Sequence, residues 1–468
     1  MCGMGRTKRK RKRKKVSQNL NEQVSHESVY TELLKFMKEK NFKSNGLVPA
    51  NFSDTGRGMM AKKTYQEGDT LISLPCQILI GTKKALQASK WAQFMLSSSK
   101  MPRFTSLQIL CVFLMEGKYK LDNGFKFDWD VYIKTLPKTF HFHHVFWDAK
   151  DIKLLPKTIQ KKVKLLHEKI RSDYIAVKDV FDSYCGQEKF ALLWDAYRWA
   201  WCCVNTRCIY SNHEELSIKN ILKSPSDYYY LAPYLDLFNH SFSAKVNGFY
   251  NQISKAYEIN TLQRWNKFEQ IFISYGPHST EDLFLEYGFI VPGQNPNDTF
   301  NVSLDNILSV TMKLKTLCSK CRKTLTFILN SHYINKDWSL SYSGLSYNLS
   351  CTILIISKLY FLIDKSNFCK NPKSCLIILQ QEKQLSSFIT EIHDGKIPFI
   401  ILSYANEIKT NLIKNMKSEF LDEFKEVSDK IIEDKNKERY QTISDLYQVT
   451  FNIFEAAMLH NIEEAFGH

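Results

Sequence analysis

The feature that most constrains the fold is a mostly apolar run at residues 231–238 that ends abruptly in Asn239, His240 and Ser241. Apolar runs carry a strand or a short helix into a core. The three polar side chains are therefore expected at the rim of that core, where their hydrogen-bonding atoms can meet a ligand.

A second segment with a polar end follows at residues 269–275. Its residues alternate, so that Ile271, Ile273 and Tyr275 share one face ahead of Gly276-Pro277. Alternation with a period of two predicts a strand, and Gly-Pro predicts a turn after it. This strand is expected to deliver the Tyr275 hydroxyl group to the end of a sheet.

A third motif, Gly56-Arg57-Gly58, lies far upstream. A dinucleotide-binding glycine loop needs a helix that starts inside it, whereas residues 62–75 here predict a turn and then a strand. A Rossmann fold is therefore excluded by context. The glycines are expected to let the backbone approach a ligand closely, or to form an ordinary hairpin turn.

Taken in their order along the chain, the three motifs resemble those of the SET-domain protein methyltransferases. Residues 198–207 (Arg-Trp-Ala-Trp-Cys-Cys-Val-Asn-Thr-Arg) are similar to the branch that contains the Rubisco large-subunit methyltransferase. The resemblance covers residues 42–289 by motif and the remainder by helical character. It implies an α+β fold: a SET domain of small twisted β-sheets with a pseudoknot and a helical insert, followed by an all-α substrate-binding domain.

The resemblance also implies S-adenosyl-L-methionine as the cofactor. Asn239 and His240 would hold its amino-acid end, and Phe289 would pack against its adenine. The full set of implied cofactor contacts is Gly56, Arg57, Gly58, Met60, Arg207, Asn239, His240 and Phe289. For Arg207 the alternative is a cation at a helix C-terminus that faces the helix dipole.

Tyr275 is the expected catalytic residue. A tyrosine hydroxyl with a pKa of about 10 is a weak base at neutral pH, so its expected task is to orient and polarise a lysine amine rather than to abstract its proton. The resemblance adds Asp236, Tyr257 and Tyr287 on the substrate side. Plain core packing is the alternative for each aromatic residue.

The composition is that of a globular protein, with 44% hydrophobic and 13% aromatic residues among 468. Twelve irregularly spaced cysteines predict reduced intracellular thiols rather than a disulfide framework. The longest apolar stretch, residues 351–363, is interrupted by Ser357 and Lys358 and falls short of a membrane span. A soluble monomer is expected.

The net charge of +16 is concentrated at the N-terminus, where residues 1–15 carry nine Lys and Arg and no acid. Such a block repels itself and is typical of a nuclear import signal or of an arm that attracts nucleic acid; a solvated tail without a function is the alternative. We expect import, hence a location in nucleus and cytoplasm, and nucleic-acid contact at most through this tail.

Three regions are predicted along the chain: a basic tail at residues 1–25, a SET domain at 26–300 with a helical insert at about 85–226, and a helical substrate-binding domain at 301–468. A short amphipathic helix over residues 27–40 opens the SET domain. Within the insert, residues 107–115, 159–171 and 189–204 have the clearest helical periodicity.

No metal is expected. Cys318 and Cys321 have zinc-ligand spacing, but no second pair lies nearby. His141-Phe-His-His144 has no acidic or thiol companions. The cysteine cluster that many SET enzymes carry after the Tyr-Gly strand is missing, as it is in the resembled branch.

Two functions remain open. The first is a protein-lysine N-methyltransferase; the resemblance implies histone lysine or other nuclear and cytosolic proteins as substrates, although one member of the branch methylates histidine. The second is a catalytically inactive module that docks proteins or chromatin. The presence of Tyr275, Asn239 and His240 favours the enzyme.

Overall fold

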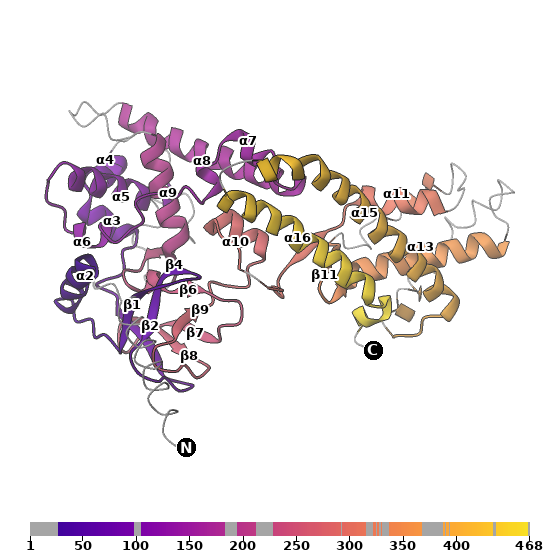
Figure 1. Ribbon diagram of the computed structural model, residues 1–468, viewed down its shortest axis with the longest axis horizontal. Coiled ribbons are helices and arrows are strands. Elements are labelled where there is room, and N and C mark those ends of the chain that lie inside the picture. Colours follow the sequence, from indigo (N-terminus) through magenta and orange to yellow (C-terminus); the bar gives the residue numbers. More distant parts are fainter. Residues whose placement is uncertain are drawn as a thin grey trace, which may run out of the picture. The chain divides into compact units, whose positions relative to one another are not determined.

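The computed structural model describes residues 27–97, 104–182, 194–211, 228–291, 293–314, 322–323, 325–326, 329, 337–366, 387–388, 390–392, 394–433 and 437–466. They form two units (Figure 1). The first unit comprises the described parts of Met1–Trp147, Lys161–Pro277 and Leu285–Gly288, and the second comprises those of Asp148–Gln160, His278–Phe284 and Phe289–His468. The predicted limits of the three regions stay predictions.

The central sheet of the first unit unites the three sequence motifs. Its strands, in spatial order, are β1 (Leu47–Phe52), β2 (Gly56–Ala61), β9 (Gln270–Ile273) and β6 (Asn239–His240). β1 and β2 form an antiparallel hairpin, and Met59 of β2 lies opposite Ile271 of β9. β6 runs parallel to β9, with His240 opposite Ile273. The side chains of Ile271 and Ile273 are buried, as their alternation predicted.

Two smaller sheets complete the β-structure of this unit. One contains β3 (Thr70–Pro75), β8 (Ala256–Thr261) and β7 (Val246–Asn251), and the other contains β4 (Cys208–Tyr210) and β5 (Tyr229–Leu231). Several short, separate sheets in place of one large sheet agree with the predicted fold class.

Helices supply the rest of the first unit. They are α2 (Ser28–Lys38), α3 (Thr82–Ala88), α4 (Lys90–Ser97), α5 (Ser106–Asp122), α6 (Asp130–Ile133), α8 (Lys157–Asp182, from residue 161) and α9 (Trp194–Arg207), with 3-10 turns η1 (His144–Phe146) and η2 (Leu235–Leu237). The helix predicted over residues 27–40 is confirmed as α2, and the segments 107–115 and 159–171 lie within α5 and α8. The segment 189–204 is helical from residue 194, and residues 189–193 lie outside the described part.

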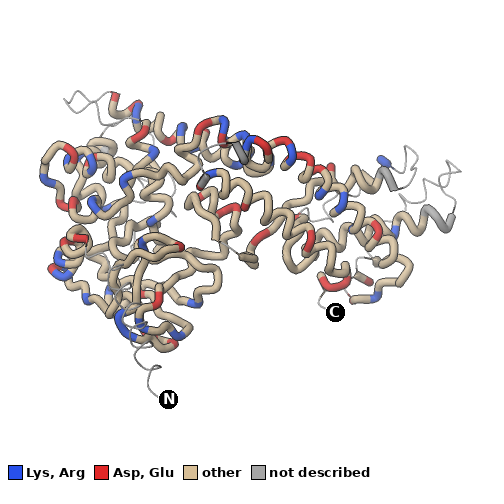
Figure 2. Tube along the Cα trace, in the orientation of Figure 1, with Lys and Arg blue, Asp and Glu red and all other residues tan. Residues whose placement is uncertain are grey.

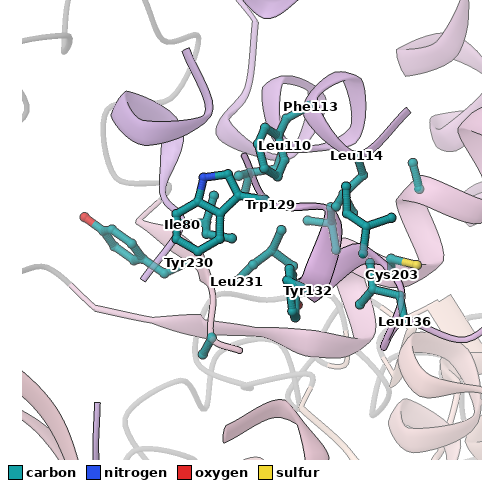
Figure 3. Packing of buried hydrophobic residues seen from close by; sticks show 14 of the residues in the cluster. Ile80, Leu110, Phe113, Leu114, Trp129, Tyr132, Leu136, Cys203, Tyr230 and Leu231 are labelled. Atoms are coloured by element: carbon teal, nitrogen blue, oxygen red, sulfur yellow. The ribbon is translucent and has the colours of Figure 1, made fainter. Parts of the chain in front are cut away.

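The core of the first unit is built around α5. A capping box, in which Thr105 and Gln108 satisfy each other's backbone N–H groups, starts this helix. Residues 109–115 of α5 are buried, and the helix packs against α9. Figure 3 shows part of this core, with Leu110 and Leu114 from α5 near Leu231 from β5. Trp199 and Trp201 of α9 are buried in this core.

The second unit is mainly helical. It contains α7 (Ala149–Ile152), the start of α10 (Thr280–Tyr287), α11 (Leu304–Leu314), α13 (Tyr347–Ser366), α15 (Phe399–Glu433), α16 (Lys437–Leu459) and the 3-10 turn η5 (Ile462–Phe466). A short sheet of β10 (Thr299–Asn301), β11 (Ser339–Ser341) and β12 (Gly344–Leu345) accompanies these helices. Acidic and basic residues are interspersed along α15 (Figure 2), which also buries apolar residues such as Leu412, Met416 and Phe420. None of the helices in the described part of the chain is both long enough and apolar enough to cross a bilayer.

Candidate active site

Tyr275 and the Asn239–His240 strand meet at one end of the central sheet. Directly after β9, the backbone N–H of Tyr275 donates to Nδ1 of His240 at 3.1 Å, and the phenol hydroxyl donates to the carbonyl oxygen of Phe238 at 2.6 Å. The two rings lie 5.1 Å apart between centroids. The parallel pairing of β6 with β9 thus places the phenol beside the strand predicted to hold the cofactor. The individual roles of these residues stay predictions.

The side-chain amide of Asn239 has a fixed orientation. Its Nδ2 donates at 2.9 Å both to the carbonyl oxygen of Arg57 and to Oε1 of Gln270, and the Thr55 hydroxyl also donates to Oε1 of Gln270, at 2.8 Å. Both amide protons are therefore engaged. Oδ1 of Asn239 receives no hydrogen bond from any described residue and is left as an acceptor. The sequence alone did not single out Gln270; its position on the opposite face of the Ile271–Tyr275 strand was the available signal.

Gly58 makes this amide network possible. A Cβ atom at residue 58 would lie 2.4 Å from Oε1 of Gln270 and 2.9 Å from Nδ2 of Asn239, closer than non-bonded atoms can approach. Gly56, with φ +66°, instead has open space around it and serves the β1–β2 turn. The absent side chain at Gly58 therefore makes room for two side chains of the protein itself.

Two further predicted cofactor residues flank this network on β2. Met60 is buried and lies opposite Gln270 in the strand register. The guanidinium group of Arg57 turns away towards α2, where it donates to the Tyr30 hydroxyl at 2.7 Å. The contact of Arg57 with the site is made by its backbone carbonyl oxygen, which accepts from Asn239.

Arg207 and Asp236 form a buried ion pair just before the Asn-His strand. Nη1 of Arg207, at the end of α9, donates to the Asp236 carbonyl oxygen at 3.1 Å and lies 3.4 Å from Oδ2. The Tyr132 hydroxyl donates to the same Oδ2 at 2.9 Å. Burial raises the pKa of Asp236, and the neighbouring Arg207 partly offsets this. The ion pair connects α9 to η2. Arg207 therefore has a specific anionic partner in addition to the helix dipole. The cofactor contact of Arg207 and the substrate contact of Asp236 stay predictions.

Three aromatic residues remain: Tyr257 and Tyr287, predicted on the substrate side, and Phe289, predicted at the adenine of the cofactor. The Tyr287 ring lies 5.0 Å from the Tyr275 ring, and burial raises the pKa of Tyr287 to about 12. Tyr257 lies on β8, in a different sheet from Asn239, with its hydroxyl 2.9 Å from the position of a Cβ at Gly248. Phe289 belongs to the second unit. The structure thus joins Tyr287 to Tyr275, while the roles of Tyr257 and Phe289 stay predictions.

The two clusters with metal-ligand residue types are Cys318 with Cys321 and the histidines of residues 141–144. Among the residues that the structure describes, no group of three or more His, Cys, Asp and Glu side chains is arranged to hold a metal ion. Cys318 and Cys321 lie outside the described residues. In the histidine cluster, His144 lies 2.8 Å through Nε2 from the Leu285 carbonyl oxygen.

Comparisons with known proteins agree with this geometry. Residues 56–276 match the SET domain family model. SET domain-containing protein 4 of Homo sapiens is 33% identical over 364 residues, which cover 76% of this chain and 78% of that protein. Ribosomal lysine N-methyltransferase set11 of Schizosaccharomyces pombe is 28% identical over 54% of this chain and 58% of its own length. The crystal structure of the SET domain of LSMT bound to lysine and AdoHcy has the same fold, with a TM-score of 0.53 at 14% identity, over 95% of this chain and 91% of that one. The chain belongs to the SET-domain family of protein methyltransferases.

Proposed function

We propose that this protein transfers a methyl group from S-adenosyl-L-methionine to the side-chain amine of lysine in a protein substrate. One observation carries the proposal: the Tyr275 phenol is hydrogen-bonded to the Phe238 carbonyl at the start of the Asn239–His240 strand. Relatives named as lysine N-methyltransferases, and a solved structure of the same fold bound to lysine and AdoHcy, support it.

The residues at the Asn239–His240 strand suit the amino-acid end of such a cofactor. Asn239 offers Oδ1 as an acceptor in an orientation that the Arg57 carbonyl and Gln270 fix. An acceptor in this place fits the ammonium group of a methionine moiety. When bound, the cofactor supplies a sulfonium-activated methyl group and leaves as a neutral thioether.

Tyr275 acts on the lysine amine as a neutral phenol. Burial raises the pKa of Tyr275 well above its usual range, so the hydroxyl keeps its proton at neutral pH. That proton is donated to Phe238, and a hydroxyl oxygen that donates its proton can also accept an N–H bond from an incoming amine. This contact would orient the amine for in-line attack.

The surroundings of Tyr275 also favour the uncharged amine that the attack needs. The Tyr287 ring covers one side of the phenol, and the His240 ring another. Apolar walls disfavour an ammonium ion, which lowers the pKa of a lysine that enters. The residues of this chain therefore position and desolvate the nucleophile.

For the acceptor protein we propose histone lysine, with other nuclear or cytosolic proteins as further substrates. The basic tail at residues 1–15 supports a nuclear location. Cytoplasmic protein is expected as well, before import.

Purified protein incubated with S-adenosylmethionine carrying a labelled methyl group tests the function. Histone octamers, nuclear extract, ribosomes and cytosolic extract serve as separate acceptors, and hydrolysed products are analysed for methylated amino acids. Label in Nε-methyllysine, with histones among the acceptors, is expected. Label in methylhistidine would refute a lysine acceptor, and label only in ribosomal or cytosolic protein would refute histones. Intact S-adenosylhomocysteine binding without transfer to any acceptor would identify a binding module.

Replacement of Gln270 by leucine is expected to weaken S-adenosylhomocysteine binding by about 5- to 10-fold, because Asn239 loses one of the acceptors that fix its amide. Gln270→Glu retains an acceptor for both Asn239 and Thr55 and is the matched control, with affinity close to the wild type. Calorimetric titration measures both variants. Equal affinity in the leucine variant and the wild type would show that the amide needs no such support.

A further inference from the structure

Two buried histidines hold the short stretch of chain that carries Tyr287. Nε2 of His144 lies 2.8 Å from the carbonyl oxygen of Leu285, and Nε2 of His143 lies 3.4 Å from that of Glu286. Leu285–Gly288 belongs to the same unit as both histidines. The last turn of α10 is therefore fixed to the SET unit from the side of η1.

The partners of the two rings select one tautomer for each. The Val145 N–H donates to Nδ1 of His143 at 3.3 Å, so the proton of His143 resides on Nε2 and points to Glu286. His144 can bond a carbonyl only as a donor, which makes its Nδ1 an acceptor for Nε2 of His167, 3.1 Å away. Both ring nitrogens of His143 and of His144 are therefore satisfied in the neutral imidazole form.

Two more contacts seat the same stretch. Nδ2 of Asn205, on α9, donates to the Glu286 carbonyl oxygen at 2.7 Å and to Oε2 of Glu286 at 2.8 Å. Gly288 has φ +79°, and a Cβ there would lie 2.8 Å from Cδ2 and 3.0 Å from Cα of His143. The backbone at residue 288 thus lies directly on His143, and only glycine fits both the space and the conformation.

Tyr287 lies between these held residues, and its ring lies 5.0 Å from the ring of Tyr275. We propose that His143 and His144 are positioning residues of the methyltransferase, which set the place of Tyr287 against Tyr275 by holding the carbonyl groups of Leu285 and Glu286. The effect on catalysis rests on the proposed function. That the two histidines hold the last turn of α10 rests on the contacts alone. A displacement of 1 Å near reacting groups can lower a rate by about 100-fold, so a loosened turn is expected to affect turnover.

The electrostatic setting keeps both histidines neutral. Burial lowers the pKa of His143 to about 4 and that of His144 well below its usual range. The titratable group that acts on both rings is His167, whose own pKa is lowered by burial and by Arg198 on α9. Arg198 donates to the Val145 carbonyl oxygen beside the pair, and the Glu286 carboxylate accepts from Asn205. Protonation of His143 would remove the acceptor that Val145 N–H uses.

This neutrality gives a pH dependence with a definite sign. Above about pH 6.5 a histidine is neutral in the folded and unfolded chain alike and adds no slope. As the pH falls from 6.5 towards 4, the unfolded chain takes up protons that the folded chain refuses, so unfolding becomes more favourable by up to about tenfold per pH unit for each histidine. Urea midpoints at pH 7.5, 6.0 and 5.0 are expected to decline less steeply in His144→Gln than in the wild type. An equal or steeper decline would contradict a neutral His144.

The positioning role is tested with His144→Ala, His144→Gln and, as a matched control on the same segment, His141→Ala at an exposed histidine. Hydrogen exchange of the peptide over residues 282–290 is measured together with kcat, the KM for S-adenosylmethionine and the affinity for S-adenosylhomocysteine. His144→Ala is expected to speed exchange in this peptide and to lower kcat by about 10- to 100-fold, with little change in cofactor affinity. The glutamine amide can donate to the Leu285 carbonyl, so His144→Gln is expected to restore most of both.

The results that would contradict the proposal can be told apart. Unchanged exchange in His144→Ala would overturn the holding contact. Faster exchange with unchanged kcat would overturn the catalytic consequence, and a parallel loss of kcat, cofactor affinity and thermal stability without rescue by glutamine would show a general structural role. A wild-type protein without methyl transfer would defeat the proposed function, while the exchange measurement would still decide whether the histidines hold the turn.

Discussion

Tyr275→Phe is expected to lower kcat for methyl transfer by about 100- to 1,000-fold, because the variant loses the hydroxyl that would accept a hydrogen bond from the lysine amine. The aromatic ring remains against His240 and Tyr287, and the backbone N–H of residue 275 still donates to His240. Affinity for S-adenosylhomocysteine is therefore expected to stay near that of the wild type. Single-turnover transfer of labelled methyl and calorimetric titration measure the two quantities.

The matched control is Tyr210→Phe, which removes a hydroxyl from an exposed tyrosine on β4 of the same unit. It is expected to leave both quantities unchanged. A Tyr275→Phe variant as active as the wild type would refute the assignment of Tyr275 as the residue that orients the amine. A variant that fails to bind S-adenosylhomocysteine would place Tyr275 in cofactor binding instead.

Asp236→Ala is expected to destabilise the protein by about 3–5 kcal/mol, because it leaves the buried guanidinium of Arg207 without its anionic partner. The loss also removes the acceptor of the Tyr132 hydroxyl. Urea denaturation at neutral pH measures the change. Since η2 leads directly into the Asn239–His240 strand, S-adenosylhomocysteine affinity is expected to fall in the same variant.

Two further variants test whether the loss of stability comes from the unpaired charge of Arg207. Asp236→Leu combined with Arg207→Met replaces both charges with apolar side chains and is expected to recover much of the stability. Asp195→Ala removes a surface partner of Arg198 and is expected to leave the urea midpoint nearly unchanged, because exposed ion pairs contribute little. A shift in Asp236→Ala no larger than that in Asp195→Ala would contradict the structural importance of the buried pair.

The local features of the fold could be predicted from the sequence. Alternation at Ile271 and Ile273 correctly predicted a strand with a buried face. The ligand contacts expected of Asn239 and His240 at the end of the apolar run stay predictions. The residues that follow Gly58 correctly excluded a dinucleotide loop. The resemblance supplied the fold class, which periodicity alone does not contain.

The remaining features depend on contacts between distant residues. Gly58 is a glycine because of Gln270 and Asn239, which pattern within one segment cannot reveal. The sequence showed His143 and His144 only as part of a histidine cluster without metal-ligand companions, whereas their rings bond carbonyl groups more than 140 residues away. No periodicity links Arg207 to Asp236 either, because the ion pair joins the end of a helix to a separate turn.

A crystal structure of the protein with S-adenosylhomocysteine is the most direct test of whether methyl transfer takes place where Tyr275 meets the Asn239–His240 strand. The amino-acid end of the ligand is expected to contact Asn239 and His240, with the Tyr275 hydroxyl facing its sulfur atom. S-adenosylhomocysteine bound elsewhere, with Tyr275 remote from its sulfur, would contradict the assignment of this junction as the methyl-transfer site.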